Sequence, residues 1–175
     1  LGECKAALRQ LRSGHGGNES ASAVLKAVER HYNSRDPAFR GFMAEAMPYF
    51  AENLSEEGLA RFWIRVTDAR ESGDSFFRER ANGLALIKLV LRHPSEAREE
   101  RLRYLLEYRQ VGNSAGRMLD VDEEVVRTVV ATRGDDIDRI LLDIYRDAQA
   151  NGRMAQSAFV TLGKCLEGRG VTQLP

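Results

Sequence analysis

The chain has 175 residues, of which 43% are hydrophobic and 30% are charged, a composition that is typical of a folded globular protein and not of a disordered one. Lysine and arginine together number 26, as do aspartate and glutamate, so the net charge is zero. That balance argues against a general nucleic-acid-binding protein and against one that binds anionic membranes, because both need an excess of positive charge. The sequence has no run of about 18 apolar residues, so we expect no membrane-spanning helix.

The two cysteines, Cys4 and Cys165, lie near opposite ends of the chain. Two cysteines are too few for a disulfide scaffold, although a single disulfide that joins the two ends of the chain stays an alternative. A cytoplasmic or other reducing compartment is the simpler interpretation. No cysteine or histidine pair has the spacing of metal ligands, and we expect neither a metal nor a cofactor. Only four of the 26 basic residues are lysines, which is typical of a GC-rich genome and suggests a bacterial source. Because the chain begins with Leu1, we expect a single all-helical domain, residues 1–175, excised from a longer protein.

The first half of the chain has apolar residues every three to four positions, which is the period of amphipathic helices. The pattern breaks at the glycine-rich loop 13–20, which has a weak likeness to a phosphate-binding loop and is predicted to be a connector. Asp36-Pro37 is a typical helix start, whereas Pro48 is expected to kink or end the helix in which it lies. Ser55 is predicted to cap the next helix. The helices predicted here cover about residues 4–11, 24–32, 37–50, 55–72 and 75–93.

The second half has the same helical period, which predicts helices over about residues 96–111, 121–130, 135–151 and 153–167. Asp120 and Glu123 have capping-box spacing before a valine-rich segment, which would also suit a strand. The stretch Gly112–Asp120 is predicted to be irregular, and Gly168–Pro175 to be a frayed tail.

These segments add up to about eight or nine helices with short connections and no convincing strand, so the predicted fold class is all-α. No fixed repeat period is found along the sequence. Two architectures fit the pattern, an irregular multi-helix bundle and a degenerate stack of helical hairpins.

Cys165 is the runner-up candidate for a catalytic residue, since a thiol acts as a nucleophile when a neighbouring base or cation lowers its pKa. It shares an apolar helix face with Leu162 and Leu166, however, and a buried structural thiol is the preferred interpretation. Cys4 has an equivalent place on its own helix and receives the same interpretation.

Other polar residues are explained by helix structure rather than by chemistry. The histidines His31 and His93 fall in last helical turns, where capping accounts for them better than catalysis does. The carboxylates of Asp135–Asp138 are assigned to helix capping and not to a calcium loop, which would need a central glycine. Arginines alternate with glutamates on the predicted helix after Ser95, and we interpret them as a solvated face, although arginine is also favoured in interfaces. These arginines are Arg98, Arg101, Arg103 and Arg109.

The function that the sequence favours is a helical protein–protein interaction module of a larger protein, with another protein as its partner and self-association as a further possibility. The alternative is an all-helical transferase or ubiquitin-ligase-like domain of the bacterial effector type, which acts through Cys165 or recruits a charged carrier enzyme. An enzyme is the less favoured of the two. Binding residues are expected in the Gly112–Asp120 loop, since loops held by rigid helices concentrate them. The candidates there are Asn113, Ser114 and Arg117.

Overall fold

The computed structural model of the chain describes residues 2–31, 37–111 and 114–171. Within these ranges the chain forms nine α-helices, one short 3₁₀ helix and one pair of three-residue strands. The predicted all-α class is therefore confirmed. None of the helices in these ranges combines the length and the apolar character that crossing a membrane requires.

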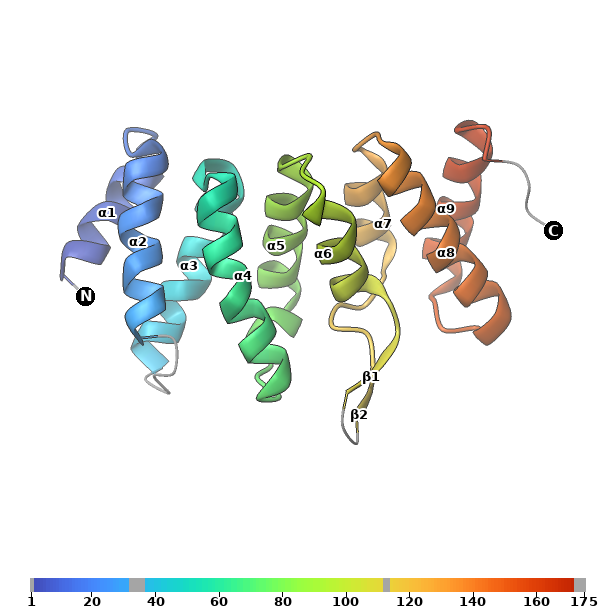
Figure 1. Cartoon of the computed structure of the whole chain (residues 1–175), viewed down its shortest axis with the longest axis horizontal. Coiled ribbons are helices and arrows are strands. Elements are labelled where there is room, and N and C mark those ends of the chain that lie inside the picture. Colours follow the sequence, from blue (N-terminus) through green and yellow to red (C-terminus); the bar gives the residue numbers. More distant parts are fainter. Residues whose placement is uncertain (1, 32–36, 112–113, 172–175) are drawn as a thin grey trace. The chain divides into compact units, whose positions relative to one another are not determined.

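The chain divides into two compact units, unit 1 (Leu1–Arg92) and unit 2 (His93–Pro175). The single domain expected from the sequence stays a prediction, because two compact units can fold as one cooperative domain. Unit 1 contains, in chain order (Figure 1), α1 (Gly2–Arg12), α2 (Gly17–His31), α3 (Pro37–Asn53), α4 (Glu56–Glu71), the 3₁₀ helix η1 (Phe76–Arg78) and α5 (Arg80–Arg92).

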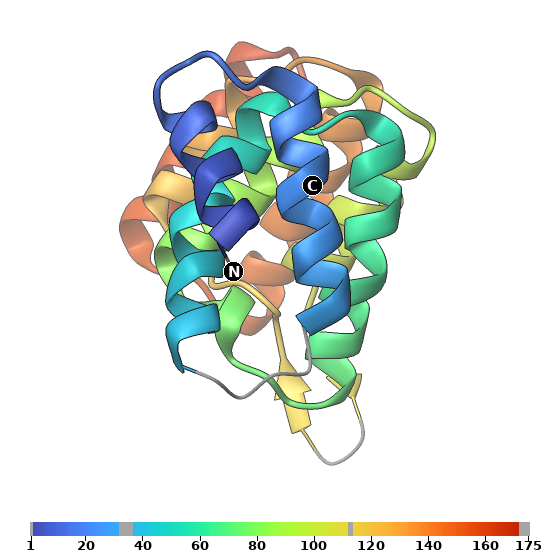
Figure 2. The same ribbon diagram turned by 90° about the vertical axis from the view of Figure 1, so that its left-hand side faces the viewer.

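Helices two apart in the sequence lie side by side in unit 1. α1 packs on α2, but it also contacts α3, and α2 contacts α4 as well as α3. Figure 2 shows α1 lying against both α2 and α3 at this end of the unit. α3 in turn packs along α5. Within unit 1 the packing therefore favours the stack of helical hairpins over the irregular bundle.

The core of unit 1 is built around aromatic rings. Phe62 of α4 contacts Phe50 of α3 and Phe77 of η1, with ring centroids 5.4 and 5.8 Å apart and edge-on geometry in both pairs. Phe76 lies edge-on to Phe77 at 5.0 Å. All four rings are buried, so this cluster ties α3, α4 and η1 together.

The helix boundaries of unit 1 follow local sequence signals in most places. α3 begins at Pro37, as predicted, while Asp36 lies outside the described residues. The hydroxyl of Ser55 accepts a hydrogen bond from the Gly58 amide (3.2 Å) and caps α4 as expected. Pro48 does not end α3, which continues to Asn53. The buried face of α3 on either side of Pro48, which includes Met47 and Phe50, holds the helix through that position.

Unit 2 contains four helices and a small hairpin within its described residues: α6 (Ala97–Leu106), β1 (Arg109–Val111), β2 (Ser114–Gly116), α7 (Glu123–Val130), α8 (Asp135–Asn151) and α9 (Gln156–Gly168). α6 packs on α8, α7 packs on α9, and α8 packs on α9. Alternate helices again lie side by side, as they do in unit 1.

The segment after α6 differs from the sequence prediction. The helix expected to reach Val111 ends at Leu106, because Glu107 takes up an extended conformation. Arg109–Val111 then pairs with Ser114–Gly116 as antiparallel strands, with Arg109 opposite Gly116. A sequence signal for this hairpin was overlooked, since a Gly-Asn pair between two short segments is typical of a hairpin turn.

The helix over the valine-rich segment is confirmed, but its cap is Asp122 and not Asp120. The Asp122 carboxylate accepts a hydrogen bond from the Val125 amide (2.9 Å), and α7 starts at Glu123. Both aspartates have the right chemistry for a cap, and the position is set by burial of the valine face that begins at Val125.

Candidate functional site

Unit 1 has a groove between α1 and α3 with a volume of about 510 Å³. We call it the α1/α3 groove. Its apolar base is formed by Leu8 of α1 and Phe42 of α3, both of which are buried. Ala38 and Gly41 of α3 contribute exposed positions with almost no side chain. A Cβ atom added at Gly41 would meet no atom within 4 Å, so the groove is open at that point. The residues that line it are Lys5, Leu8, Arg9, Arg12, Ala38, Gly41, Phe42 and Glu45.

The wall that α1 contributes to the groove is cationic. Lys5, Arg9 and Arg12 lie four and three positions apart, so they share one face of the helix. Arg12 forms an ion pair across the groove with Glu45 of α3, at 3.1 Å between its Nη2 and the Glu45 Oε2. Lys5 and Arg9 make no ion pair with any carboxylate in the described part of the chain. Glu45 is the one acidic residue in the lining, and two positive charges of the groove are left uncompensated.

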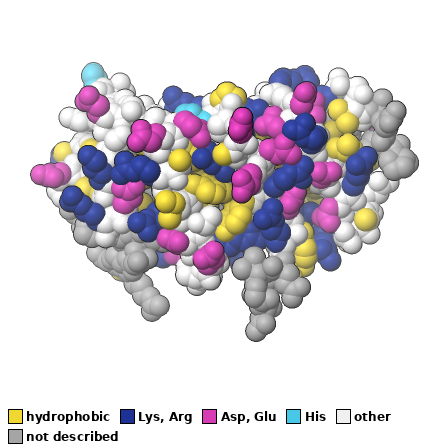
Figure 3. Space-filling view, in the orientation of Figure 1, with side chains coloured by type: hydrophobic (Ala, Val, Ile, Leu, Met, Phe, Trp, Pro, Cys, Tyr) yellow, Lys and Arg dark blue, Asp and Glu magenta, His cyan; other side chains and the backbone are white. Residues whose placement is uncertain are grey.

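Many cations elsewhere on the described surface do face a carboxylate. Over the face drawn in Figure 3, acidic and basic side chains lie next to each other, and many of them form ion pairs. In unit 1, for example, both guanidinium groups of Arg61 and Arg40 face a carboxylate, of Glu29 and Asp74 respectively. The α1/α3 groove is thus one place in unit 1 where cations without a carboxylate partner line a hollow.

The residues predicted to bind a partner fall on the hairpin of unit 2. Asn113 lies outside the described residues, and Ser114 is placed by its backbone as the first residue of β2. Arg117 follows β2, and its side chain is only 8% exposed. The Arg117 guanidinium donates to the carbonyls of Leu106 (2.9 Å) and Arg153 (2.8 Å).

The remaining bond of Arg117 goes to the Asp147 carboxylate of α8, at 2.5 Å. The side chain therefore fastens the hairpin to the end of α6, to α8 and to the turn after α8. A partner-binding role for Arg117 stays a prediction. Its contacts support a structural role, in which it holds the hairpin against the neighbouring helices.

A second cavity, of about 220 Å³, lies beside Arg117. Tyr108 is partly exposed at this cavity, and the Arg153 guanidinium stacks over its ring at 3.9 Å from the centroid. The carboxylates that line it already face arginines, since Asp147 pairs with Arg117 and Glu107 pairs with Arg103. Its charges are thus balanced within the chain, which makes it a weaker binding site than the α1/α3 groove.

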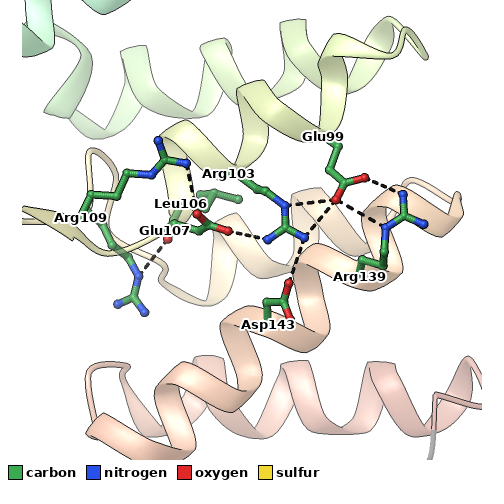
Figure 4. A network of polar contacts seen from close by, with 8 residues as sticks. Glu99, Arg103, Leu106, Glu107, Arg109, Arg139 and Asp143 are labelled. Carbon is green, nitrogen blue, oxygen red and sulfur yellow. Dashed lines mark hydrogen bonds and ion pairs between the residues drawn. The ribbon is translucent and has the colours of Figure 1, made fainter.

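Charge pairs also link the two facing helices α6 and α8 (Figure 4). Arg103 of α6 forms ion pairs with Glu99 of the same helix (3.0 Å) and with Glu107, which directly follows it (2.5 Å). It also pairs with Asp143 of α8 (2.9 Å). Arg139 of α8 reaches back to Glu99 at 2.5 Å, and this bond holds the pKa of Glu99 below its ordinary value. The network joins α6 to α8, and each of its charged groups has an oppositely charged partner within unit 2. We therefore interpret it as a stabilising contact between the two helices and not as a binding site.

Two arginines expected on a solvated face, Arg98 and Arg101, are instead buried. Arg98 makes two parallel hydrogen bonds to the Asp136 carboxylate, both at 2.7 Å. This bidentate geometry satisfies the guanidinium inside unit 2 and explains why it is tolerated there. The interpretation of these two residues as solvated was wrong, because the carboxylate that accepts Arg98 lies 38 positions along the chain.

The Arg98–Asp136 pair makes the stability of the protein depend on pH. The hydrogen bonds from Arg98 lower the pKa of Asp136 below its ordinary value. Such a carboxylate contributes its full stabilisation above the unfolded-state pKa of about 3.9, and the contribution is lost as the pH falls through the lower folded-state pKa. We expect the wild-type free energy of unfolding to fall more steeply than that of Asp136→Asn between about pH 5 and pH 2, since the amide gains no proton. Urea unfolding followed by circular dichroism across this range measures it, and parallel pH curves would contradict the expectation.

The two cysteines are free thiols and are only partly buried, in contrast to the fully buried sulfurs expected from their apolar neighbours. Leu162 and Leu166, on either side of Cys165, are buried, so the thiol lies at the edge of the apolar face of α9. No group of three or more histidine, cysteine or acidic side chains among the described residues is placed to hold a metal ion. The cysteine-dependent transferase stays a prediction.

No model of a protein family matches the chain, and no match is found among the curated proteins or among the solved structures. The α1/α3 groove is therefore identified by its own geometry and charge.

Proposed function

We propose that the chain is a protein-interaction module that binds an acidic segment of a partner protein in the α1/α3 groove of unit 1. The observation that carries this proposal is the combination of an apolar base, at Leu8 and Phe42, with the unpaired cations of Lys5 and Arg9 along one wall. Protein interfaces characteristically combine a desolvated apolar centre with charged groups at the rim.

The chemistry of the groove favours a polypeptide over other anions. A phosphate or a sugar acid would use the cations but would fill little of the 510 Å³ of the groove, whereas a peptide segment supplies both carboxylates and side chains that occupy it. The zero net charge of the chain is also unlike that of proteins that bind nucleic acids or anionic membranes through broad positive surfaces. An acidic protein segment matches both the local charge and the local apolar area.

Photo-crosslinking from inside the groove tests the proposal. A benzophenone amino acid replaces Glu45, whose exposed side chain lines the groove, and in a separate control replaces exposed Ala150 of α8. After irradiation in an extract of the source organism, we expect one partner to be joined to position 45 and not to position 150. The crosslinked segment should be rich in aspartate and glutamate, and its joining should be lost in a Lys5→Glu/Arg9→Glu variant. No product beyond that of the control, or a crosslinked segment without acidic residues, would contradict the proposal.

A further inference from the structure

We infer that the occupant of the α1/α3 groove is an amphipathic α-helix that presents two carboxylates four residues apart and, on the adjoining part of the same face, an apolar side chain directed at Gly41. This inference rests on the proposed function and specifies the shape and spacing of the partner segment. Four observations support the inference. They are the spacing of Lys5 and Arg9, the absence of a sheet edge along the groove, the Arg12–Glu45 ion pair, and the open space above Gly41.

The spacing of the cations sets the spacing of the partner charges. Lys5 and Arg9 are one helical turn apart on α1, which corresponds to about 6 Å along the helix axis. A second helix lying along α1 repeats this distance when its own acidic residues are four positions apart. Both positively charged groups can then be paired at once without bending either helix.

The backbone around the groove favours a helical occupant over an extended one. All residues that line the groove belong to α1 or α3, so no strand edge borders it. An extended peptide would find no sheet edge here to satisfy its own backbone groups. A helix satisfies its amides and carbonyls internally and needs only side-chain contacts from the groove, in the manner of a helix that binds between two others.

The Arg12–Glu45 pair is an internal example of the contact proposed for the partner. Glu45 projects from α3 and meets a cation of α1 across the groove at 3.1 Å. Carboxylates carried by a helix can therefore reach the cationic wall of α1 at ion-pair distance. The same pair also occupies Arg12, which leaves Lys5 and Arg9 as the two positions for a partner.

The opening above Gly41 defines the third contact. Ala38 and Gly41 are three positions apart on α3, and both are exposed within the lining. Positions with so little side chain let a neighbouring helix approach closely, as ridges do when they pack into grooves. An apolar side chain at position i+3 of the partner helix, next to carboxylates at i and i+4, would reach toward Phe42 and Leu8 through this opening.

Binding of a synthetic helix tests the inference. The probe is a fluorescent alanine-based peptide of about 18 residues with Glu, Leu and Glu at positions i, i+3 and i+4 of its central turn, which places all three on one side of the helix, and it is long enough to be partly helical. A matched peptide carries glutamines in place of both glutamates, and fluorescence anisotropy gives the dissociation constants. We expect the glutamate peptide to bind at least about five times more tightly than the glutamine peptide, and to weaken as salt is raised from about 50 to about 300 mM.

Four variants of the protein separate this geometry from non-specific charge attraction. Lys5→Gln and Arg9→Gln should each weaken binding by about two- to ten-fold, whereas Glu45→Gln should strengthen it by releasing Arg12. Gly41→Leu should abolish binding with no loss of thermal stability, because leucine is a better helix former than glycine and the position is open. Circular dichroism melting curves verify that each variant is folded.

Equal binding of the two peptides, or Glu45→Gln binding no more tightly than wild type, would overturn the helix inference. Capture of an acidic segment from position 45 in the crosslinking experiment, with no binding of the helical peptide, would refute the inference but leave the proposed function intact. If the crosslinking experiment also captured no acidic segment, both the helix inference and the proposed function would be refuted.

Discussion

Replacing Phe62 with alanine is expected to lower the free energy of unfolding by about 4 kcal/mol. Phe62 is 0% exposed and lies between Phe50 and Phe77, so truncation loses both edge-on ring contacts and leaves a cavity between α3, α4 and η1. A loss of this size is a large share of the 5–15 kcal/mol or so that holds a typical domain folded. Urea or guanidinium unfolding monitored by circular dichroism measures it, and Phe62→Leu should lose much less because it fills most of the space.

Ile64→Ala is the matched control for this experiment. Ile64 is on the same helix two positions away but is 57% exposed, so its removal should change the free energy of unfolding by less than about 0.5 kcal/mol. Similar losses for the two variants would mean that the aromatic cluster does not stabilise unit 1. A loss below about 2 kcal/mol for Phe62→Ala would also contradict the described packing.

The second large effect is expected at Arg169, for which Arg169→Met should cost about 3 kcal/mol of stability. The side chain of Arg169 is 2% exposed and pairs with the Asp138 carboxylate. Its guanidinium also donates to the carbonyls of Val130 (2.5 Å) and Thr132 (2.8 Å), at and just beyond the end of α7. Methionine has a similar length but no donor, so it would leave a carboxylate and two carbonyls without their partner.

Arg127→Met provides the comparison for Arg169. Arg127 also pairs with a carboxylate, Glu123, but its side chain is 67% exposed, and solvent-exposed pairs contribute at most about 1 kcal/mol. Denaturant unfolding of both variants gives the two losses directly. A cost for Arg169→Met as small as that for Arg127→Met would show that the end of α9 is not fastened through this side chain.

The features that sequence predicted well are those decided by neighbouring residues. The start of α3 at Pro37 and the Ser55 cap of α4 depend on backbone geometry within one helical turn, so they could be predicted locally. The helix over the valine-rich segment depends on a pattern of buried positions that is also local. In each case the tertiary structure agrees with the local preference.

The buried arginines could not be predicted in the same way. Arg98 is buried because Asp136, from another helix, supplies two hydrogen bonds, and Arg169 is buried because three groups from α7, α8 and the turn between them surround it. In the sequence Arg98 is a charged residue among other charged residues, a pattern typical of solvated positions, and Arg169 lies in the segment Gly168–Pro175, which the sequence predicts to be a frayed tail. Their burial is decided by partners more than 30 positions away.

The candidate site was missed for a related reason. The spacing of Lys5, Arg9 and Arg12 on one helix face was visible in the sequence and could have indicated a cationic wall. The opposite wall, with Ala38 and Gly41, belongs to α3, and no sequence pattern places α3 against α1. The sequence favoured the Gly112–Asp120 loop instead, but Arg117 of that loop donates its hydrogen bonds to groups within unit 2.

Arg117 has a consequence for how unit 2 opens. The Arg117 guanidinium donates to the carbonyl of Leu106 at the end of α6, to the carboxylate of Asp147 in α8 and to the carbonyl of Arg153 after α8. We therefore expect these three segments to separate from the strand pair together and not one at a time. Loss of any one contact weakens the hold on the others, and the hairpin and the turn after α8 belong to the same cooperative opening event. Amide protons in these two distant parts of the chain would then exchange with solvent at a common rate.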